Sequence, residues 1–327
     1  MRHVTILGFD YALASAITGV CDLLSVAGVS WNRIHGQPEN KQFEVEIVTQ
    51  NAEPVRCVNG LEIKAHKSMA DVTHTDLLLI PTIAGNIERT LEECQYALPW
   101  LRHHHEQGAD IASNCTGAFL LAQSGLLDNK KATTHWGFID QFQKKFPMVN
   151  LQPEQLITSD GSIFCSGGGM AWFDMALFLI ERYCGYDIAS ECAKSHVIDM
   201  GRGNQTAYSS LPGKRYHQDS SILQLQNWLD KHLASNINIE TLANQAAMGE
   251  RTFKRRFKAA TGHSPINYLQ SLRIEAAKKL LVSGRHTVEA ITFQVGYVDV
   301  SSFIRLFKTH TGLSPSAYRA RFAQRAF

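Results

Sequence analysis

The sequence lacks the features of three classes of protein. No uninterrupted apolar run reaches the roughly 20 residues that a membrane-spanning helix needs, so we expect no membrane segment. The 7 cysteines form no C-x-x-C pair, and their odd number leaves one over, which indicates reduced thiols in a cytoplasmic protein. The glycine cluster SGGGM (166–170) has neither the G-x-G-x-x-G pattern nor a Walker lysine, so we predict a tight turn and no nucleotide cofactor.

The histidine run and the first residues of the chain exclude two further features, a metal site and a signal peptide. The histidines at 103–105 are consecutive and cannot share one helical face, so we predict no metal site. The first residues, MRHVTILGF (1–9), are typical of a β-strand rather than a signal peptide. With 327 residues, of which 44% are apolar and 19% charged, the chain has the length and composition of two globular domains.

The small overall charge of +2 hides an asymmetry along the chain. Residues 218–327 carry 15 Lys and Arg against 7 Asp and Glu, a balance of +8. Residues 1–217 carry 17 against 23, a balance of −6. A basic part joined to an acidic part suggests a polyanion-binding domain joined to a sensing domain, although charge alone fits a solvated helical surface equally well.

Strand-like and helical patterns alternate through residues 1–185, which is typical of a mostly parallel sheet with helices on both faces. The expected strands are 3–9, 43–49, 75–82, 109–114 and 162–167, and the expected helices are 14–31, 87–107, 116–127, 137–146 and 170–185. The run TDLLLIPT (75–82) is apolar almost throughout, as in a central strand. Because ligands bind at the carboxyl ends of the strands in such sheets, we expect the site at that edge.

The segment ADIASNCTGAFLLAQSGLLDNKKATTHW (109–136) places Cys115 on a turn from strand to helix. Many hydrolases hold their nucleophile on such a turn, and the start of a helix stabilises a thiolate. Cys115 is therefore either a reactive thiol or a buried structural cysteine, and we favour the first. We predict that it lines a small-molecule pocket with Ile83, Thr116, His135 and Gly168.

The C-terminal part contains an internal repeat with a period of 50 residues. FKRRFKAATGHSPINY (253–268) and FIRLFKTHTGLSPSAY (303–318) agree at nine of 16 positions. Phe253 and Phe257 are four residues apart and are expected to face a core, and Gly262 is expected to end the helix. Each copy follows a short helical segment and a turn, and a helical pattern over 264–284 connects the two.

A short helix, a turn and a second helix with a polar outer face form a helix-turn-helix, whose second helix enters the major groove of DNA. We therefore predict double-stranded DNA as a partner. The predicted DNA-binding residues are Arg251, Thr252, Lys254, Arg255 and Lys258 in the first copy, and Val300, Ser301, Ile304, Arg305 and Lys308 in the second. The first set can contact phosphates or guanines, and the second can add apolar contacts with thymine methyl groups.

Residues 219–322 resemble the DNA-binding domain of AraC/XylS-type transcriptional regulators. The resemblance lies in LANQAAMGERTFKRRFK, YLQSLRIEAAKKLL and VGYVDVSSFIRLFKTHTGLSPSAYR. The sequence departs from the family pattern at Thr292 and Phe293, where a small residue often follows the isoleucine. We expect this departure to alter the packing of the second unit and to leave its outline intact.

Residues 3–185 resemble the ThiJ/PfpI branch of the class I glutamine-amidotransferase-like fold, through CTGAFLLAQSGLL followed by ATTHW. The resemblance implies that an enzymatic member places a glutamate beside the thiol, from the end of the first strand or the helix after it. That region here, GFDYALASAITGV (8–20), has no Glu, and Asp10 is the only carboxylate within reach. Without an acid to exchange a proton, ligand binding is favoured over turnover.

The combination of both domains resembles the GlxA-like subgroup of AraC-type regulators. We expect an α/β ligand-sensing and dimerisation domain at 1–199, of the flavodoxin-like or amidotransferase-like sandwich type. A linker rich in Gly, Pro and Ser follows at 200–219, and an all-α domain with two helix-turn-helix units at 220–327.

The resemblance implies a cytoplasmic, nucleoid-associated bacterial transcription factor, an activator that uses no cofactor. Its implied partners are a small metabolite, often nitrogen-containing, RNA polymerase and a second copy of the chain. One alternative is a thiol-dependent hydrolase or lyase that uses Cys115 and His135 and carries a DNA-binding domain. Another is a constitutive DNA-binding protein whose N-terminal domain only dimerises.

Overall fold

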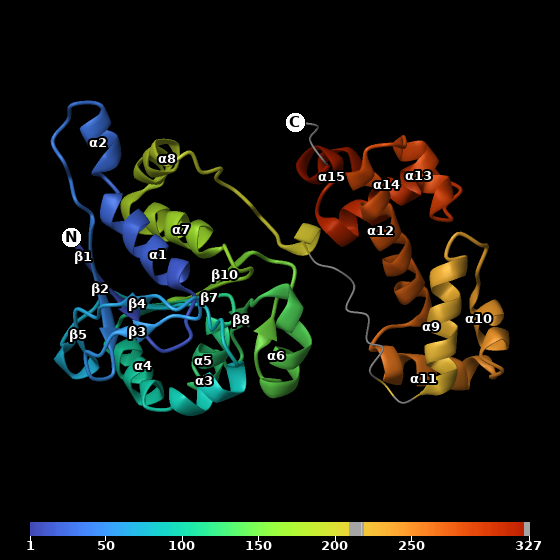
Figure 1. The fold of residues 1–327 in the computed structure, drawn as a ribbon, viewed down its shortest axis with the longest axis horizontal. Helices are drawn as coiled ribbons and strands as arrows, with labels where there is room; N and C mark the ends of the chain where they lie inside the picture. Colours follow the sequence, from blue (N-terminus) through green and yellow to red (C-terminus); the bar gives the residue numbers. More distant parts are fainter. Residues whose placement is uncertain (209–216, 218, 324–327) are drawn as a thin grey trace. The chain divides into compact units, whose positions relative to one another are not determined.

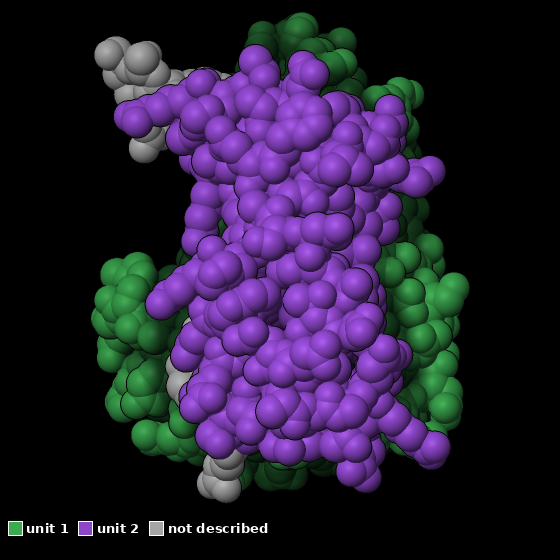
Figure 2. All heavy atoms as spheres, turned by 90° about the vertical axis from the view of Figure 1, so that its right-hand side faces the viewer, with its two compact units in different colours: residues 1–205 green, residues 206–327 purple. Residues whose placement is uncertain are grey.

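The structure, a computed structural model, describes residues 1–208, 217 and 219–323 and divides the chain into two compact units. Unit 1 is Met1–Gln205 and unit 2 is Thr206–Phe327, coloured separately in Figure 2. Unit 1 therefore extends past the predicted boundary at residue 199, because the chain still packs on it as far as Gln205, which is 1% exposed. Of the predicted linker 200–219, residues 209–216 and 218 lie outside the described residues.

Unit 1 is built on a seven-stranded sheet with the order β10-β11-β7-β6-β1-β2-β5. Its neighbouring strands run parallel, except that β10 is antiparallel to β11. The strands are β1 (Arg2–Leu7), β2 (Phe43–Thr49), β5 (Lys67–Ser68), β6 (Leu77–Ile80), β7 (Asp110–Asn114), β10 (Ile157–Asp160) and β11 (Ile163–Ser166). The mostly parallel sheet and all five predicted strands are confirmed.

Two small two-stranded sheets accompany the main one. The first pairs β3 (Val55–Arg56) with β4 (Glu62–Ile63), and the second pairs β8 (Lys131–Ala132) with β9 (Asn150–Leu151). The sequence pattern does not predict these pairs, because strands of two residues carry no periodicity of their own.

Helices cover both faces of the main sheet (Figure 1). One face carries α1 (Ala14–Val26), α7 (Trp172–Cys184) and α8 (Tyr186–Ser195), with α2 (Ser30–Ile34) next to α8. The other face carries α3 (Ile87–Glu93), α4 (Ala97–Glu106) and α5 (Gly117–Gln123), with α6 (Ile139–Lys145) beside them. The predicted helix 14–31 is wrong as one element, because Gly28 has a φ of 72° and separates α1 from α2. The stretch 87–107 is likewise two helices. In the part of the chain that the structure describes, no helix has the length and apolar character to cross a membrane.

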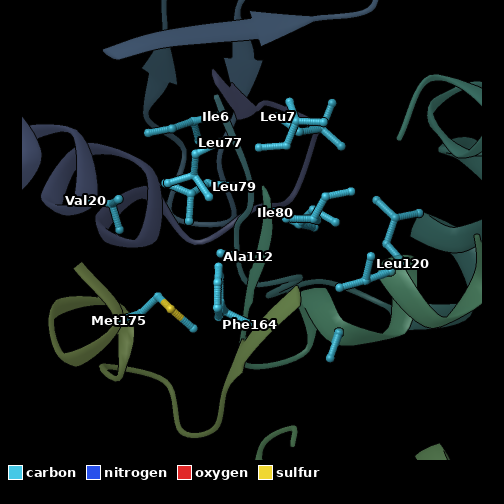
Figure 3. Close-up of a cluster of buried hydrophobic side chains, with 14 of the residues drawn as sticks. Ile6, Leu7, Val20, Leu77, Leu79, Ile80, Ala112, Leu120, Phe164 and Met175 are labelled. Atoms are coloured by element: carbon cyan, nitrogen blue, oxygen red, sulfur yellow. The ribbon is translucent and has the colours of Figure 1, made fainter. Parts of the chain in front are cut away.

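The core of unit 1 is centred on β6, the predicted central strand. Its four side chains are at most 4% exposed. Because side chains alternate across a strand, Leu77 and Leu79 point to the side of Val20 in α1, whereas Ile80 points toward Leu120 in α5 (Figure 3). The burial of both faces accounts for the continuous apolar run in the sequence.

Unit 2 consists of helices α9 (Ser220–His232), α10 (Ile239–Gln245), α11 (Glu250–Thr261), α12 (Pro265–Ser283), α13 (Val288–Gln294), α14 (Val300–Thr311) and α15 (Pro315–Phe322), preceded by the short 3-10 helix η3 (Thr206–Tyr208). The predicted connecting helix is α12, and it contributes to both hydrophobic cores. Tyr268 packs in the core of the first copy, and Ala277 packs in the core of the second. Gly262 ends α11 in the left-handed conformation, as predicted, with a φ of 81°.

The two departures from the family pattern fit into α13 without disturbing the repeat. Thr292 is fully buried, and its hydroxyl donates a hydrogen bond to the Val288 carbonyl oxygen at 2.9 Å. Phe293 points outward and is 52% exposed. The burial pattern over 301–310 is the same, residue by residue, as that over 251–260. The outline of the second helix-turn-helix copy is therefore intact.

The turns of the two helix-turn-helix copies differ at one equivalent position, and this difference leads to a prediction about stability. Ala247 follows α10 with a φ of 53°, and Gly296 follows α13 with a φ of 86°. A Cβ on Gly296 would lie 2.8 Å from the Ala234 backbone. We expect Gly296→Ala to lower the free energy of unfolding of unit 2 by about 1–3 kcal/mol. The new Cβ would clash with the Ala234 backbone, and an alanine is strained at a positive φ.

Scanning calorimetry of the full chain checks this, with Ala247→Gly as the matched control in the other turn. That control removes left-handed strain and should leave the unfolding temperature unchanged or slightly higher. Equal unfolding temperatures for Gly296→Ala and wild type would contradict the strain at this turn.

Candidate functional sites

Cys115 stands on the sharp turn between β7 and α5 that the sequence predicts. Its φ is 56°, a left-handed value that is unusual for a residue other than glycine. Its N–H donates to the Ser166 carbonyl oxygen at 2.7 Å, and its carbonyl oxygen accepts from the Thr134 hydroxyl at 2.9 Å. Gly117 follows, and a Cβ there would lie 2.5 Å from the Pro81 carbonyl oxygen. The helix can therefore start only if this residue has no side chain.

Two of the predicted pocket residues are directly joined next to this turn. The Thr116 hydroxyl donates to the Ile83 carbonyl oxygen at 2.6 Å. Ile83 in turn forms an isolated bridge with Ala12, just before α1. The carboxyl ends of β1, β6 and β7 thus meet around Cys115, as expected for a site in a parallel sheet.

The environment of the Cys115 thiol disfavours its charged form. Cys115 is 3% exposed, and burial raises the pKa of its thiol above the usual value. Hydrogen bonds with Thr116 and Thr82 act in the opposite direction but do not outweigh burial. The expectation that the start of α5 would favour a thiolate is therefore wrong, since desolvation outweighs it.

No carboxylate acts on this thiol among the residues that the structure describes. The groups that shift the pKa of Cys115 are burial and two threonines. The start of α1 lies close by, because the Leu13 N–H donates to the Thr82 carbonyl oxygen at 3.0 Å. Asp10 is turned elsewhere, and its carboxylate accepts the Arg56 N–H at 3.0 Å.

His135 lies on the segment that contacts the turn, but its described hydrogen bond leads elsewhere. Its Nδ1 accepts the Gly137 N–H at 3.0 Å and so caps η2 (Trp136–Phe138). The ring packs against Trp136 with centroids 5.1 Å apart, and burial lowers the pKa of His135. The neutral ring with Nδ1 as acceptor carries its proton on Nε2.

Gly168 belongs to the turn between β11 and α7 and has a φ of 69°. Its neighbour Gly167 is the more constrained position, because a Cβ there would lie 2.4 Å from the Gln205 side-chain amide. That amide bonds the Thr134 carbonyl oxygen at 2.8 Å and accepts the Trp136 N–H at 3.2 Å. Gln205 therefore connects the glycine turn to the segment around His135, a contact that no local sequence pattern indicates.

A separate cavity of about 230 Å³ opens beside this site, at the carboxyl ends of β1 and β2. Its walls include Phe9, Asp10, Glu53, Cys94 and Tyr96. None of the five predicted pocket residues lines it. Burial raises the pKa of the Cys94 thiol to about 11, so this second thiol is also protonated near neutral pH.

The second helices of the two helix-turn-helix units, α11 and α14, present the predicted DNA-binding residues on one face each. Phe253 and Phe257 of α11 are fully buried, and so are their equivalents in α14. The predicted residues are exposed in both helices except Val300, which is half-buried, and Ile304 is 37% exposed. The buried stripe thus fixes which side chains face solvent.

The exposed face of α11 is cationic, but its charges are not equally available. Lys254 forms an ion pair with Glu250, one turn earlier, at 2.9 Å. For Arg251, Arg255 and Lys258, the described part of the chain offers no ion pair. These three side chains can therefore contact an anionic partner without first breaking an internal bond.

Arg256 lies on the other side of α11 and has a structural role. Its guanidinium forms two hydrogen bonds with Asp219, at 2.9 and 2.8 Å, and lowers the pKa of that carboxyl. Asp219 also caps α9. The equivalent position in α14 is Leu306, which packs against the second core instead.

Comparison with protein families divides the chain in the same way. A helix-turn-helix domain model matches residues 242–321, and the DJ-1/PfpI family model matches residues 29–182. The first match covers α10 to α15 apart from the ends, and the second contains the Cys115 turn.

Individual relatives agree with this pair of domains. The chain is 27% identical to the HTH-type transcriptional regulator CdhR of Pseudomonas aeruginosa over 290 residues, which cover 88% of this chain and 84% of that protein. It is 29% identical to the isonitrile hydratase of Pseudomonas putida over 203 residues, 60% of this chain and 86% of the enzyme. Drosophila melanogaster DJ-1beta has the same fold as unit 1, with a TM-score of 0.50 at 20% identity over 61% of this chain and 100% of that one.

The buried thiol leads to a prediction of its reactivity. We expect the rate of Cys115 alkylation by iodoacetamide to keep rising with pH past about 8.5, the usual cysteine value, because burial raises the pKa of the thiol. Peptide mass spectrometry over a pH series measures the rate. Cys94, with a pKa of about 11, is an internal reference in the same samples. A plateau of the Cys115 rate below pH 8 would show an activated thiolate instead.

Proposed function

Because the chain is a DNA-binding transcriptional regulator that joins an AraC-type helix-turn-helix domain to a DJ-1/PfpI-family domain, we propose that a small metabolite bound at the Cys115 turn controls its binding to DNA. The observation that carries this proposal is the Cys115 turn itself. It retains the backbone of a nucleophile turn, with a φ of 56°, around a protonated thiol on which no described carboxylate acts.

The chemistry of the site supports binding rather than turnover. General acid–base catalysis at a thiol needs a group that takes up and returns its proton. Here the thiol contacts threonine hydroxyls, and the Nδ1 of His135 is occupied by the Gly137 N–H. Hydroxyls, backbone groups and the rings near His135 can hold and orient a small polar ligand without changing it.

The rival proposal is a thiol-dependent hydrolase or lyase that uses Cys115 and His135. The similarity of unit 1 to an isonitrile hydratase favours it. It requires that ligand binding reorganise the site, because the thiol must lose its proton and His135 must exchange its bond to Gly137 for one to sulfur.

A direct test identifies the bound molecule and asks whether it is changed. Wild type, Cys115→Ser and Cys115→Met are purified from their host under mild conditions, and bound small molecules are identified by mass spectrometry. We expect wild type and Cys115→Ser to carry the same molecule. Cys115→Met should carry none, since its longer side chain fills the site.

The controls separate loss of the site from loss of the fold. Circular dichroism melting should be close to that of wild type in both variants, and so should DNA binding measured after the bound molecule has been removed from all three proteins. A chemically altered molecule from wild type, next to an unaltered one from Cys115→Ser, would favour the enzyme instead.

On the DNA side, we propose that α11 and α14 each enter a major groove, with α12 holding them apart. The free charges on α11 suit phosphate and guanine contacts, and Ile304 on α14 suits a thymine methyl group. We further propose that the chain works as a homodimer and contacts RNA polymerase as an activator. The Phe293 ring on α13, which is 52% exposed, offers an apolar contact for such a partner.

The ion pair in α11 yields an ordered prediction for three variants. With a duplex selected from a random library by the wild-type chain, Arg255→Ala should weaken specific binding by about 1–3 kcal/mol if it contacts a base. Lys258→Ala should weaken binding to all sequences and flatten the salt dependence. Lys254→Ala should have the smallest effect, because Lys254 already pairs with Glu250.

Fluorescence anisotropy at several salt concentrations measures these differences. Lys279→Ala removes a charge from α12, outside the predicted contacts, and is the matched control. Equal affinities for wild type and all three α11 variants would contradict the assigned face.

A further inference from the structure

Gln205 is a buried polar residue in a segment with the composition of a linker. It is 1% exposed and is the last residue of unit 1. Four acceptors lie within bonding distance of its Nε2: the Thr134 carbonyl at 2.8 Å, the Pro153 carbonyl at 3.0 Å, the Thr133 hydroxyl at 3.2 Å and the Gln155 carbonyl at 3.4 Å. Because an amide has only two N–H groups, the two shortest contacts are the principal bonds. The side chain is thus held from several directions.

The Gln205 side chain bonds the backbone of both residues that flank His135. Its Nε2 donates to the Thr134 carbonyl oxygen, and its Oε1 accepts the Trp136 N–H at 3.2 Å. The Thr134 hydroxyl donates in turn to the Cys115 carbonyl oxygen at 2.9 Å. A path of two side-chain hydrogen bonds therefore joins the end of unit 1 to the backbone of the Cys115 turn.

The backbone before Gln205 is tied to unit 1 as well. The Gln205 N–H donates to the Glu154 carbonyl oxygen at 3.0 Å, and Asn204 forms an isolated bridge with Gln155. Arg202 forms a two-bonded ion pair with the buried Asp174, and its guanidinium lies 4.1 Å from the centre of the Phe173 ring. Of these contacts, only those of the Gln205 side chain reach the segment that touches Cys115.

The residues directly after Gln205 pack in the hydrophobic core beneath α14. Ala207 of η3 is 3% exposed and lies in the same hydrophobic core as Phe303 and Phe307 of α14. The Tyr208 ring packs edge to face against Phe322, with centroids 5.4 Å apart. Only Thr206 separates the residue bonded near Cys115 from the residue buried under α14.

We propose that Gln205 couples the Cys115 site to α14. Rearrangement of residues 133–136 by a ligand breaks or reorients the bonds of the Gln205 side chain, and this moves η3 relative to α14. The proposal rests on the proposed function, since it requires that the chain bind DNA. It adds a specific residue and route by which the two units are coupled. Coupling of this kind is reciprocal, so DNA binding must also affect residues 133–136.

Reciprocity allows a test without the metabolite. Amide hydrogen exchange of the full chain is followed by mass spectrometry, with and without the selected DNA duplex as the probe. In wild type we expect the duplex to change the exchange rate of peptides spanning 133–136 at least threefold. In Gln205→Met, which keeps the volume and loses the amide, the duplex should still bind and that change should disappear.

Asp174→Asn is the matched control, because it weakens the tie to Arg202 in the same segment without touching residues 133–136. It should retain the DNA-dependent change. If Gln205→Met does not fold, Thr134→Val gives an independent test, because it removes only the bond to the Cys115 carbonyl. The change should then persist at 133–136 and be lost from peptides containing Cys115 and Thr116.

The outcomes distinguish failure of the proposed function from failure of the coupling through Gln205. Failure of wild type to select or bind any duplex would refute the proposed function. A duplex that binds wild type without changing exchange at 133–136 would refute the coupling alone. A change that persists in folded Gln205→Met would also refute the coupling through this residue.

Discussion

The left-handed backbone of Cys115 is the constraint on which the site in unit 1 depends. A residue other than glycine keeps a φ of 56° only when its surroundings hold it there. Here Ser166 of β11 accepts its N–H, and Thr134 donates to its carbonyl oxygen. The same bonds that hold the turn therefore fix the segment carrying His135, so the two parts of the site cannot move independently.

This arrangement explains how one fold can serve both an enzyme and a regulator. In this chain the strand-to-helix turn supplies a buried thiol at the start of α5. The groups that β1, α1 and the His135 segment place near the thiol set the chemistry open to it. In this chain α1 begins with Ala14 and Ser15, and burial keeps the Cys115 thiol protonated. The turn lies at the carboxyl edge of the sheet, held by the hydrogen bonds to Ser166 and Thr134.

Unit 2 combines one repeated core with two different surfaces. Phe253 and Phe303 are equally buried, and the burial patterns around them agree. The exposed positions differ, since Lys254 corresponds to Ile304, so the two helices present different side chains to solvent. The inner positions differ as well. Arg256 ties α11 to α9, whereas Leu306 packs in the core that also receives η3. Within unit 2, the second helix-turn-helix copy is thus the one whose core includes Ala207 of η3.

The sequence by itself determined those features that local pattern encodes. The apolar runs predicted five of the seven strands of the main sheet, and the 50-residue repeat predicted both helix-turn-helix units and the exposed face of α11. The position of Cys115 between a strand and a helix predicted the turn. Only the tertiary structure decided the rest. Burial, which depends on distant segments, raised the pKa of the Cys115 thiol. Gln205 lies in a stretch with the composition of a linker, and its partners are 50 to 72 positions away in the chain. No local pattern specifies such contacts, because the free energy that buries an amide comes from the acceptors that the fold brings to it.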